Sequence, residues 1–133
     1  MKKITLLLLT VLTLVSCQKS RQEMDSARAF LRNEANAANT ELAGSQIDYA
    51  TVCDGCEFIN DNFHYYYTVD ENYVSIADME ANKENIKNMQ RSMFENMPSV
   101  KPLTDNLNTI DGKVIFHYTG NISGRTMLIE IDF

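Results

Sequence analysis

The chain of 133 residues contains no tryptophan, two prolines, five glycines, three cysteines and two histidines. A four-ligand zinc site needs more cysteines or histidines at suitable spacing, because His64 and His117 are single and far apart in the sequence. Basic residues are also few: 12 Lys and Arg stand against 18 Asp and Glu, a net charge of −6. Nucleic-acid binding requires clustered Lys and Arg, so we expect no nucleic-acid partner.

Catalytic signatures are also missing from the sequence. It contains no GxSxG, HExxH or P-loop pattern. The candidate general bases are His64 and His117, and neither is accompanied by a recognisable nucleophile. We therefore expect a protein that is not an enzyme and that uses no cofactor and no metal.

No apolar run approaches the roughly twenty residues that a transmembrane helix needs. The longest is Ile4–Val15, twelve uncharged residues that follow Lys2 and Lys3. Its length suits the apolar segment of an export signal. The run ends in Leu14-Val15-Ser16-Cys17, which resembles the lipobox of bacterial lipoproteins. That resemblance implies cleavage before Cys17, which then carries lipid; the alternative is an ordinary secretory signal with an incidental cysteine.

The lipobox resemblance divides the chain into three parts: a signal peptide at 1–16, a lipidated tether at 17–24 and a single domain at 25–133. Removal of the signal peptide takes away two lysines and no acid, so the net charge of the remaining chain falls from −6 to −8. Two or more acyl chains hold a protein firmly on a membrane without spanning it. Gln18 stands where inner-membrane lipoproteins of enterobacteria carry Asp, which favours the outer membrane over the inner membrane. The expected location is the cell envelope, with the domain in the periplasm or at the cell surface.

The remaining cysteines form the stretch Cys53-Asp54-Gly55-Cys56. A redox-active CxxC normally opens a helix, whose dipole lowers the thiol pKa, whereas Asp54-Gly55 is a turn signal between two β-like runs. Outside the cytoplasm a cysteine pair is usually oxidised. The sequence favours a structural disulfide or a quiescent thiol pair and leaves redox chemistry and metal binding as alternatives.

Hydrophobic periodicity predicts an α+β domain. Helices are predicted at 24–42 and 78–97, and strands at 47–59 with a kink at Asp54-Gly55, 63–69, 113–119 and 125–133. Asn60-Asp61 is a turn signal between the predicted strands at 47–59 and 63–69. Met79, Met89, Met93 and Met97 fall on one side of the second helix, where we expect them in the core rather than in a binding groove.

Two segments resemble each other. The stretch beginning at Ile59 aligns without gaps with the stretch beginning at Ile110, which pairs Phe63 with Val114, Tyr65 with Phe116, Tyr67 with Tyr118 and Thr68 with Thr119. A helix precedes each expected hairpin, so duplication of a helix-plus-hairpin unit is one interpretation and chance likeness of strands is the other. The predicted order is α-β-β-α-β-β, with a single four-stranded antiparallel sheet and helices packed on one face.

The aromatic strand "Phe-His-Tyr-Tyr-Tyr-Thr" and the later "Gly-Lys-Val-Ile-Phe-His-Tyr-Thr" resemble a widespread family of small exported bacterial proteins without an assigned activity. The resemblance covers roughly residues 46–133. The layout is also similar to periplasmic sheet-plus-helix folds of the PepSY and β-lactamase-inhibitor type. That likeness implies binding of proteins across an open sheet.

The predicted open face is more apolar than a water-facing sheet needs. We therefore expect a non-enzymatic, lipid-anchored module that binds a protein or another envelope component through this face. The alternatives are a structural homodimer that covers the same face, and a small CxxC redox protein. The residues of the predicted binding face are His64, Tyr66, Thr68, Ile115, His117, Thr119, Leu128 and Glu130.

Overall fold

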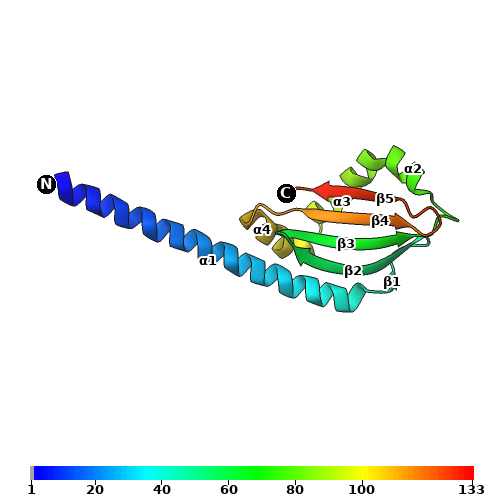
Figure 1. The fold of residues 1–133 in the computed structure, drawn as a ribbon, viewed down its shortest axis with the longest axis horizontal. Coiled ribbons are helices and arrows are strands. Elements are labelled where there is room, and N and C mark those ends of the chain that lie inside the picture. Colours follow the sequence, from blue (N-terminus) through cyan, green and yellow to red (C-terminus); the bar gives the residue numbers. More distant parts are fainter. Residues whose placement is uncertain (1) are drawn as a thin grey trace.

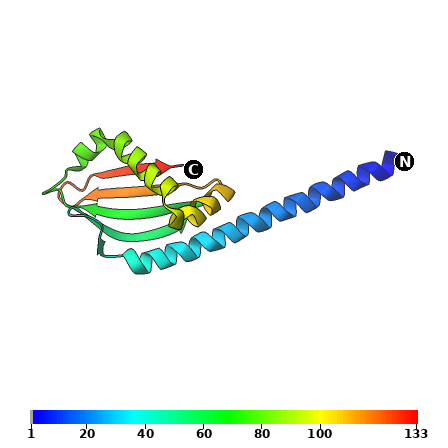
Figure 2. The same ribbon diagram turned by 180° about the vertical axis from the view of Figure 1, so that it is seen from behind.

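A computed structural model describes the backbone of residues 2–133 and the side chains from residue 20 onward. It has one five-stranded sheet with helices (Figures 1 and 2). The strands are β1 (Ser45–Gln46), β2 (Thr51–Ile59), β3 (Asn62–Val69), β4 (Val114–Gly120) and β5 (Thr126–Ile131). The helices are α1 (Lys2–Leu42), α2 (Ile76–Ala81), α3 (Lys83–Asn96), the 3-10 turn η1 (Pro98–Val100) and α4 (Lys101–Thr109). The α+β class is therefore confirmed.

The sheet differs from the predicted one in strand number and in one pairing. The short strand β1 adds a fifth strand by pairing with β2. The spatial order is β1-β2-β3-β4-β5, and the central β3–β4 pair is parallel while the others are antiparallel. The chain between β3 and β4 contains three helices, which gives it the length that a parallel crossover connection requires. The prediction of four antiparallel strands was therefore wrong.

The internal likeness has a structural explanation. The ungapped alignment of the two segments is the same as the register of the parallel β3–β4 pair, for example Tyr65 beside Phe116 and Tyr67 beside Tyr118. However, β3 closes the first hairpin whereas β4 opens the second. Duplication of a helix-plus-hairpin unit would not align these two strands. The likeness arises because β3 and β4 are parallel neighbours, so residues at matching positions point to the same face of the sheet.

Local sequence explains two features of β2, the turn that follows it and a bulge within it. Asn60 and Asp61 both have positive φ (53° and 62°), which is the backbone of a type I′ turn and suits Asn and Asp. The register of β2 shifts between Cys53 and Gly55, so the kink predicted at Asp54-Gly55 is a β-bulge. Asn39 of α1 lies against Gly55, where a side chain would collide with it.

Helix α1 ends where the pattern predicted but begins much earlier, at Lys2. Its first part extends beyond the sheet, and its second part runs along the β2 side (Figure 1). The residues that pack against the core begin at Met24. Leu31 is fully buried, with Ala27 and Ala35 one turn away on either side. Within the described part of the chain, no helix has both the length and the apolarity to cross a membrane.

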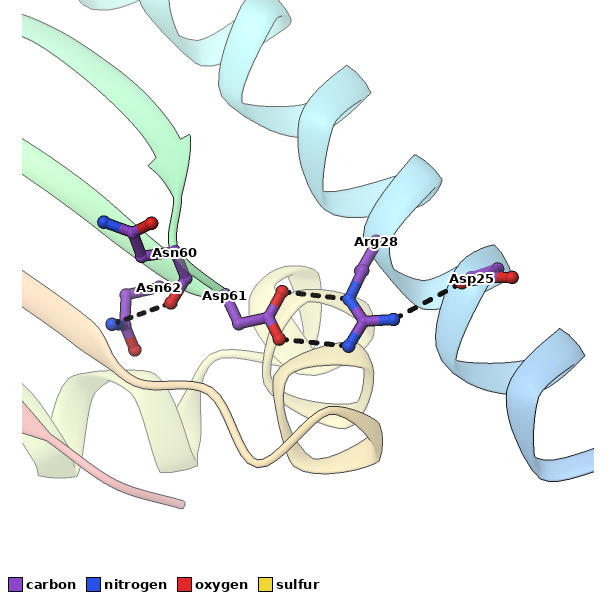
Figure 3. A network of polar contacts seen from close by, with 5 residues as sticks. All are labelled: Asp25, Arg28, Asn60, Asp61 and Asn62. Atoms are coloured by element: carbon purple, nitrogen blue, oxygen red, sulfur yellow. Dashed lines mark hydrogen bonds and ion pairs between the residues drawn. The ribbon is translucent and has the colours of Figure 1, made fainter. Parts of the chain in front are cut away.

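An ion pair fixes α1 to the β2–β3 turn. The guanidinium of Arg28 donates to both carboxylate oxygens of Asp61 at 2.9 and 3.0 Å and to Asp25 at 3.3 Å (Figure 3). These hydrogen bonds hold the pKa of Asp61 below its usual value, and they raise that of Arg28. The bidentate geometry fixes the orientation of the turn against the helix.

The helices lie on one face of the sheet, as predicted (Figure 2). Strand β5 alternates cleanly, with Met127, Ile129 and Ile131 buried and the residues between them exposed. The second predicted helix is broken at Asn82 into α2 and α3, and Pro98 follows the end of α3. Pro102 lies in the first turn of α4, a position where proline favours the start of a helix.

Candidate functional site

An apolar groove lies on the helix-covered face of the sheet. It has a volume of about 640 Å³ and lies between α3, the β1–β2 connection and the central strands. That volume falls in the range of about 300–1,000 Å³ that is usual for small-molecule sites. The residues that line it are Ile47, Asp48, Tyr49, Ala50, Thr51, Tyr65, Tyr67, Val69, Val74, Met79, Ile86, Met89, Gln90, Met93, Phe94, Met97, Val100, Phe116 and Tyr118.

Aromatic rings from β3 and β4 form the floor of the groove. The parallel register places Tyr65 beside Phe116 and Tyr67 beside Tyr118, with ring centroids 5.3 and 5.2 Å apart. Rings along each strand also stack, for example Tyr65 on Tyr67 at 6.2 Å. Phe94 of α3 meets Phe116 edge-on at 5.9 Å. The floor is therefore a continuous aromatic surface held by the sheet backbone.

Methionines of α3 and of its C-terminal cap, Met97, form one wall. Met89, Met93 and Met97 are 60%, 54% and 45% exposed, and α3 has no buried residue. The expectation that the methionine stripe lies in the core was therefore wrong for these three residues, whereas Met79 packs against the core. These three methionines face the sheet, but the groove separates them from it, so their thioethers remain open to solvent. Methionine is flexible and polarizable, and it recurs on binding surfaces that adapt to their ligand.

Polar groups are few in the groove, and one of them, Gln90 of α3, reaches the aromatic floor. The Gln90 amide nitrogen donates a hydrogen bond to the Tyr118 hydroxyl. The Gln90 side-chain oxygen is buried without a hydrogen-bond partner. Burial raises the pKa of Tyr118 to about 12 and also raises that of Tyr65 and Tyr67. These three phenols are therefore protonated at neutral pH and are able to donate a hydrogen bond.

Charge is almost absent from the lining. Among the described lining residues, Asp48 is the one with a charged side chain. Its carboxylate accepts a hydrogen bond from the Ala50 amide at 2.8 Å, which fixes it in the β1–β2 connection. No cationic side chain from residues 20–133 lines the groove to neutralise an anionic ligand.

The predicted binding face lies on the other side of the sheet, and its centre is a pair of histidines. His64 Nδ1 and His117 Nε2 are 2.8 Å apart, and the ring centroids are 5.1 Å apart, so the two nitrogens face each other. Tyr66 stacks on His117 at 4.6 Å and donates to Glu57 at 3.0 Å. Burial, with the charge of His64 as the second cause, lowers the pKa of His117. One of the two facing nitrogens carries a proton and donates the hydrogen bond, and the other accepts it. Protonation of the accepting nitrogen would place two N–H groups opposite each other and break the hydrogen bond.

The other residues of the predicted binding face have varied surroundings. Thr68 donates to Asp54 at 2.6 Å, and Lys113 pairs with Glu130 at 3.5 Å. Leu128 is 43% exposed, whereas Ile115 is only 8% exposed and offers little surface to a partner. The remaining member is Thr119, which is half-buried.

The cysteine pair is buried beneath α1. Cys53 and Cys56 pair with Tyr67 and Tyr65, so the bulge places both on the helix-covered face. The structure shows both as free thiols. Burial, together with the neighbouring Cys53, raises the pKa of Cys56 to about 12. Such a thiol is a poor nucleophile, because the thiolate is the reactive form.

Two further sequence predictions concern sites that the structure describes only in part. The side chain of Cys17 lies outside the described residues. Among the residues that are described, no cluster of three His, Cys, Asp or Glu is placed to hold a metal ion.

Comparisons with known proteins show the fold alone. No protein-family model matches the sequence, and no curated protein matches it. The structure is similar to the crystal structure of a "putative secreted protein" from Pseudomonas aeruginosa, with a TM-score of 0.67 and 9% sequence identity. The similarity covers 83% of this chain and 92% of the Pseudomonas protein.

Proposed function

We propose that the protein is an exported, lipid-anchored binding module that takes an apolar ligand in the groove between α3 and the sheet. The proposal includes no chemical reaction. The observation that carries it is the concave apolar groove, with three methionines about half exposed above an aromatic floor. Such side chains gain stability when a ligand removes them from water.

The proposed address rests on the sequence before residue 20. Lys2 and Lys3, the apolar run and Ser16-Cys17 fit a lipoprotein signal. A fold shared with a protein described as secreted supports an exported domain. We propose that Cys17 carries the lipid and that, with Gln18 after it, the outer membrane is the destination.

Binding is tested with the full chain carrying Cys17→Ser, so that no acyl chain of its own competes for the groove. The probe is N-phenyl-1-naphthylamine, an uncharged dye that fluoresces in apolar surroundings. We expect saturable binding that Met93→Gln weakens and that Ile122→Gln leaves unchanged, because Ile122 is exposed on the β4–β5 turn. Absence of saturable binding, or equal binding by both variants, would reject the proposed function.

Anchoring is tested separately, by growing the native host with a clickable fatty acid. We expect the label on the wild-type protein and none on Cys17→Ser. A labelled Cys17→Ser protein, or an unlabelled wild type, would contradict the proposed anchor without affecting the groove.

The open sheet face stays a prediction as a second binding surface. The half-exposed Tyr66–His117 stack favours a partner there, because Tyr is frequent among residues that hold protein partners. A homodimer through this face would show concentration-dependent sizing, which Tyr66→Ala with His117→Ala would abolish. The redox alternative has little support, because both cysteines are buried and the pKa of Cys56 is raised.

A further inference from the structure

From the groove's size, polarity and charge together, we infer that its ligand is an uncharged single-chain amphiphile with a hydroxyl or amide head group. The head group lies against Gln90, and the chain lies along the methionines of α3. This inference rests on the proposed function and specifies the ligand class of the same groove.

The volume of the groove matches a ligand with one chain. The groove of about 640 Å³ has room for roughly twenty non-hydrogen atoms if each takes ~30 Å³, the share of one water molecule in the liquid. A single acyl chain of about twelve carbons with a small head group fits this space. A two-chain phospholipid would leave its second chain largely outside the groove.

The polar requirement comes from Gln90. One end of its amide bonds the Tyr118 hydroxyl, and the other end is buried without a partner. A buried polar atom without a partner is costly, so a ligand group that bonds the oxygen once the Gln90 side chain turns toward the groove gains affinity and orientation. A hydroxyl or amide both donates and accepts, and it therefore suits Gln90 as well as the protonated phenols of Tyr65 and Tyr67.

Charge excludes the commonest single-chain lipid, a fatty-acid anion. Among the side chains that the structure describes, none in the groove is a cation that could pair with a carboxylate, and Asp48 in the lining repels it. Burying an unpaired carboxylate in apolar surroundings is strongly unfavourable. The net charge of −6 of the whole chain acts in the same direction.

The experiment is a competition against N-phenyl-1-naphthylamine bound to the Cys17→Ser full chain. The competitors are 1-dodecanoylglycerol and dodecanoate, which share one acyl chain and differ in the charge of the head group. At about pH 8 the dodecanoate is fully ionised, because carboxyl groups of this kind titrate near 4–5. We expect the glycerol ester to displace the dye at least about tenfold more strongly than the anion, a ratio typical of one hydrogen bond or one unfavourable charge contact.

Two variants test the reasons for the preference. Gln90→Leu removes the amide, including its unpaired oxygen, at nearly constant side-chain volume. We expect this variant to bind the glycerol ester about tenfold more weakly. Gln22→Leu is the control, since Gln22 is exposed on α1 outside the groove. Asp48→Asn keeps the side-chain oxygen that accepts from Ala50 and removes the charge, so it should strengthen dodecanoate binding and leave the ester unchanged. Circular dichroism establishes that each variant is folded.

The outcomes separate the two levels of the proposal. If the dye itself does not bind, the proposed function fails. If the dye binds but dodecanoate displaces it as well as the ester does, the ligand class is wrong while the groove remains a binding site. If Gln90→Leu is folded and binds the ester like the wild type, the assigned head-group position is wrong.

Discussion

The double variant Met89→Gln/Met93→Gln should reduce ligand affinity strongly while leaving the fold nearly as stable as before. Both side chains line the groove and are 60% and 54% exposed in the free protein. Glutamine has a similar length and a high helix propensity, so α3 itself should persist. The change therefore acts on the surface that a ligand covers rather than on the core.

The magnitude follows from the exposed fractions. Complete burial of a methionine side chain contributes about 1.5–3 kcal/mol. A ligand that covers the exposed half of each side chain should gain about 1 kcal/mol from each, and about 2 kcal/mol from both. That corresponds to an affinity loss of about 30-fold.

The assay is the dye titration, accompanied by urea unfolding followed by circular dichroism. Leu128→Gln is the matched control, because Leu128 is 43% exposed on the opposite face of the sheet. We expect the control to bind like the wild type. The reasoning is refuted if the double variant keeps its affinity within about threefold, a difference under 1 kcal/mol, or if Leu128→Gln loses as much.

Three predictions concern stability and pH. Leu31→Ala should lower the free energy of unfolding by about 3 kcal/mol, because Leu31 is fully buried on the core-facing side of α1; a loss below about 1 kcal/mol in urea unfolding would show that α1 does not pack as described. Asp61→Asn keeps a turn-compatible residue but loses the ion pair with Arg28. Since the pKa of Asp61 is lowered in the fold, the wild type should be more stable than this variant at neutral pH, and the difference should vanish as the pH falls through the folded pKa, below about 4; a difference that persists at pH 2 would contradict this. The pKa of His117 is also lowered, so the unfolded chain takes up the proton first and stability should fall as the pH drops below about 6.5. His117→Gln should flatten that decline, and an unchanged profile in unfolding experiments between pH 7.5 and 5 would contradict the role assigned to the pair.

Features with a local cause could be predicted from the sequence. Asn60-Asp61 specifies a turn because both residues tolerate positive φ, and the structure has the turn there. The alternation in β5 separates its buried residues from its exposed ones, as observed. The kink at Asp54-Gly55 appears as a β-bulge.

Features decided by long-range packing could not be predicted in the same way. Nothing within β3 or β4 distinguishes parallel from antiparallel pairing, because both expose the same alternate residues. The sequence did contain a clue, since the alignment of the two segments equals the parallel register. β1 pairs over only two residues, which is too short to give a periodic signal.

The groove was missed for a related reason. A methionine stripe on a helix looks the same whether the helix packs tightly on a sheet or stands above it. What leaves Met89 and Met93 exposed is the position of α3 relative to the β1–β2 connection and the aromatic floor. The signal that was available is the high methionine content of one helix face, with four methionines between positions 79 and 97.

The groove as the ligand-binding site is tested most directly by NMR of the methionine methyl groups during titration with the dye. The account predicts that the methyl signals of Met89, Met93 and Met97 shift on binding, while those of Met24 on α1 and the buried Met127 on β5 stay in place. Saturable binding that leaves the three groove methyls unshifted would contradict it.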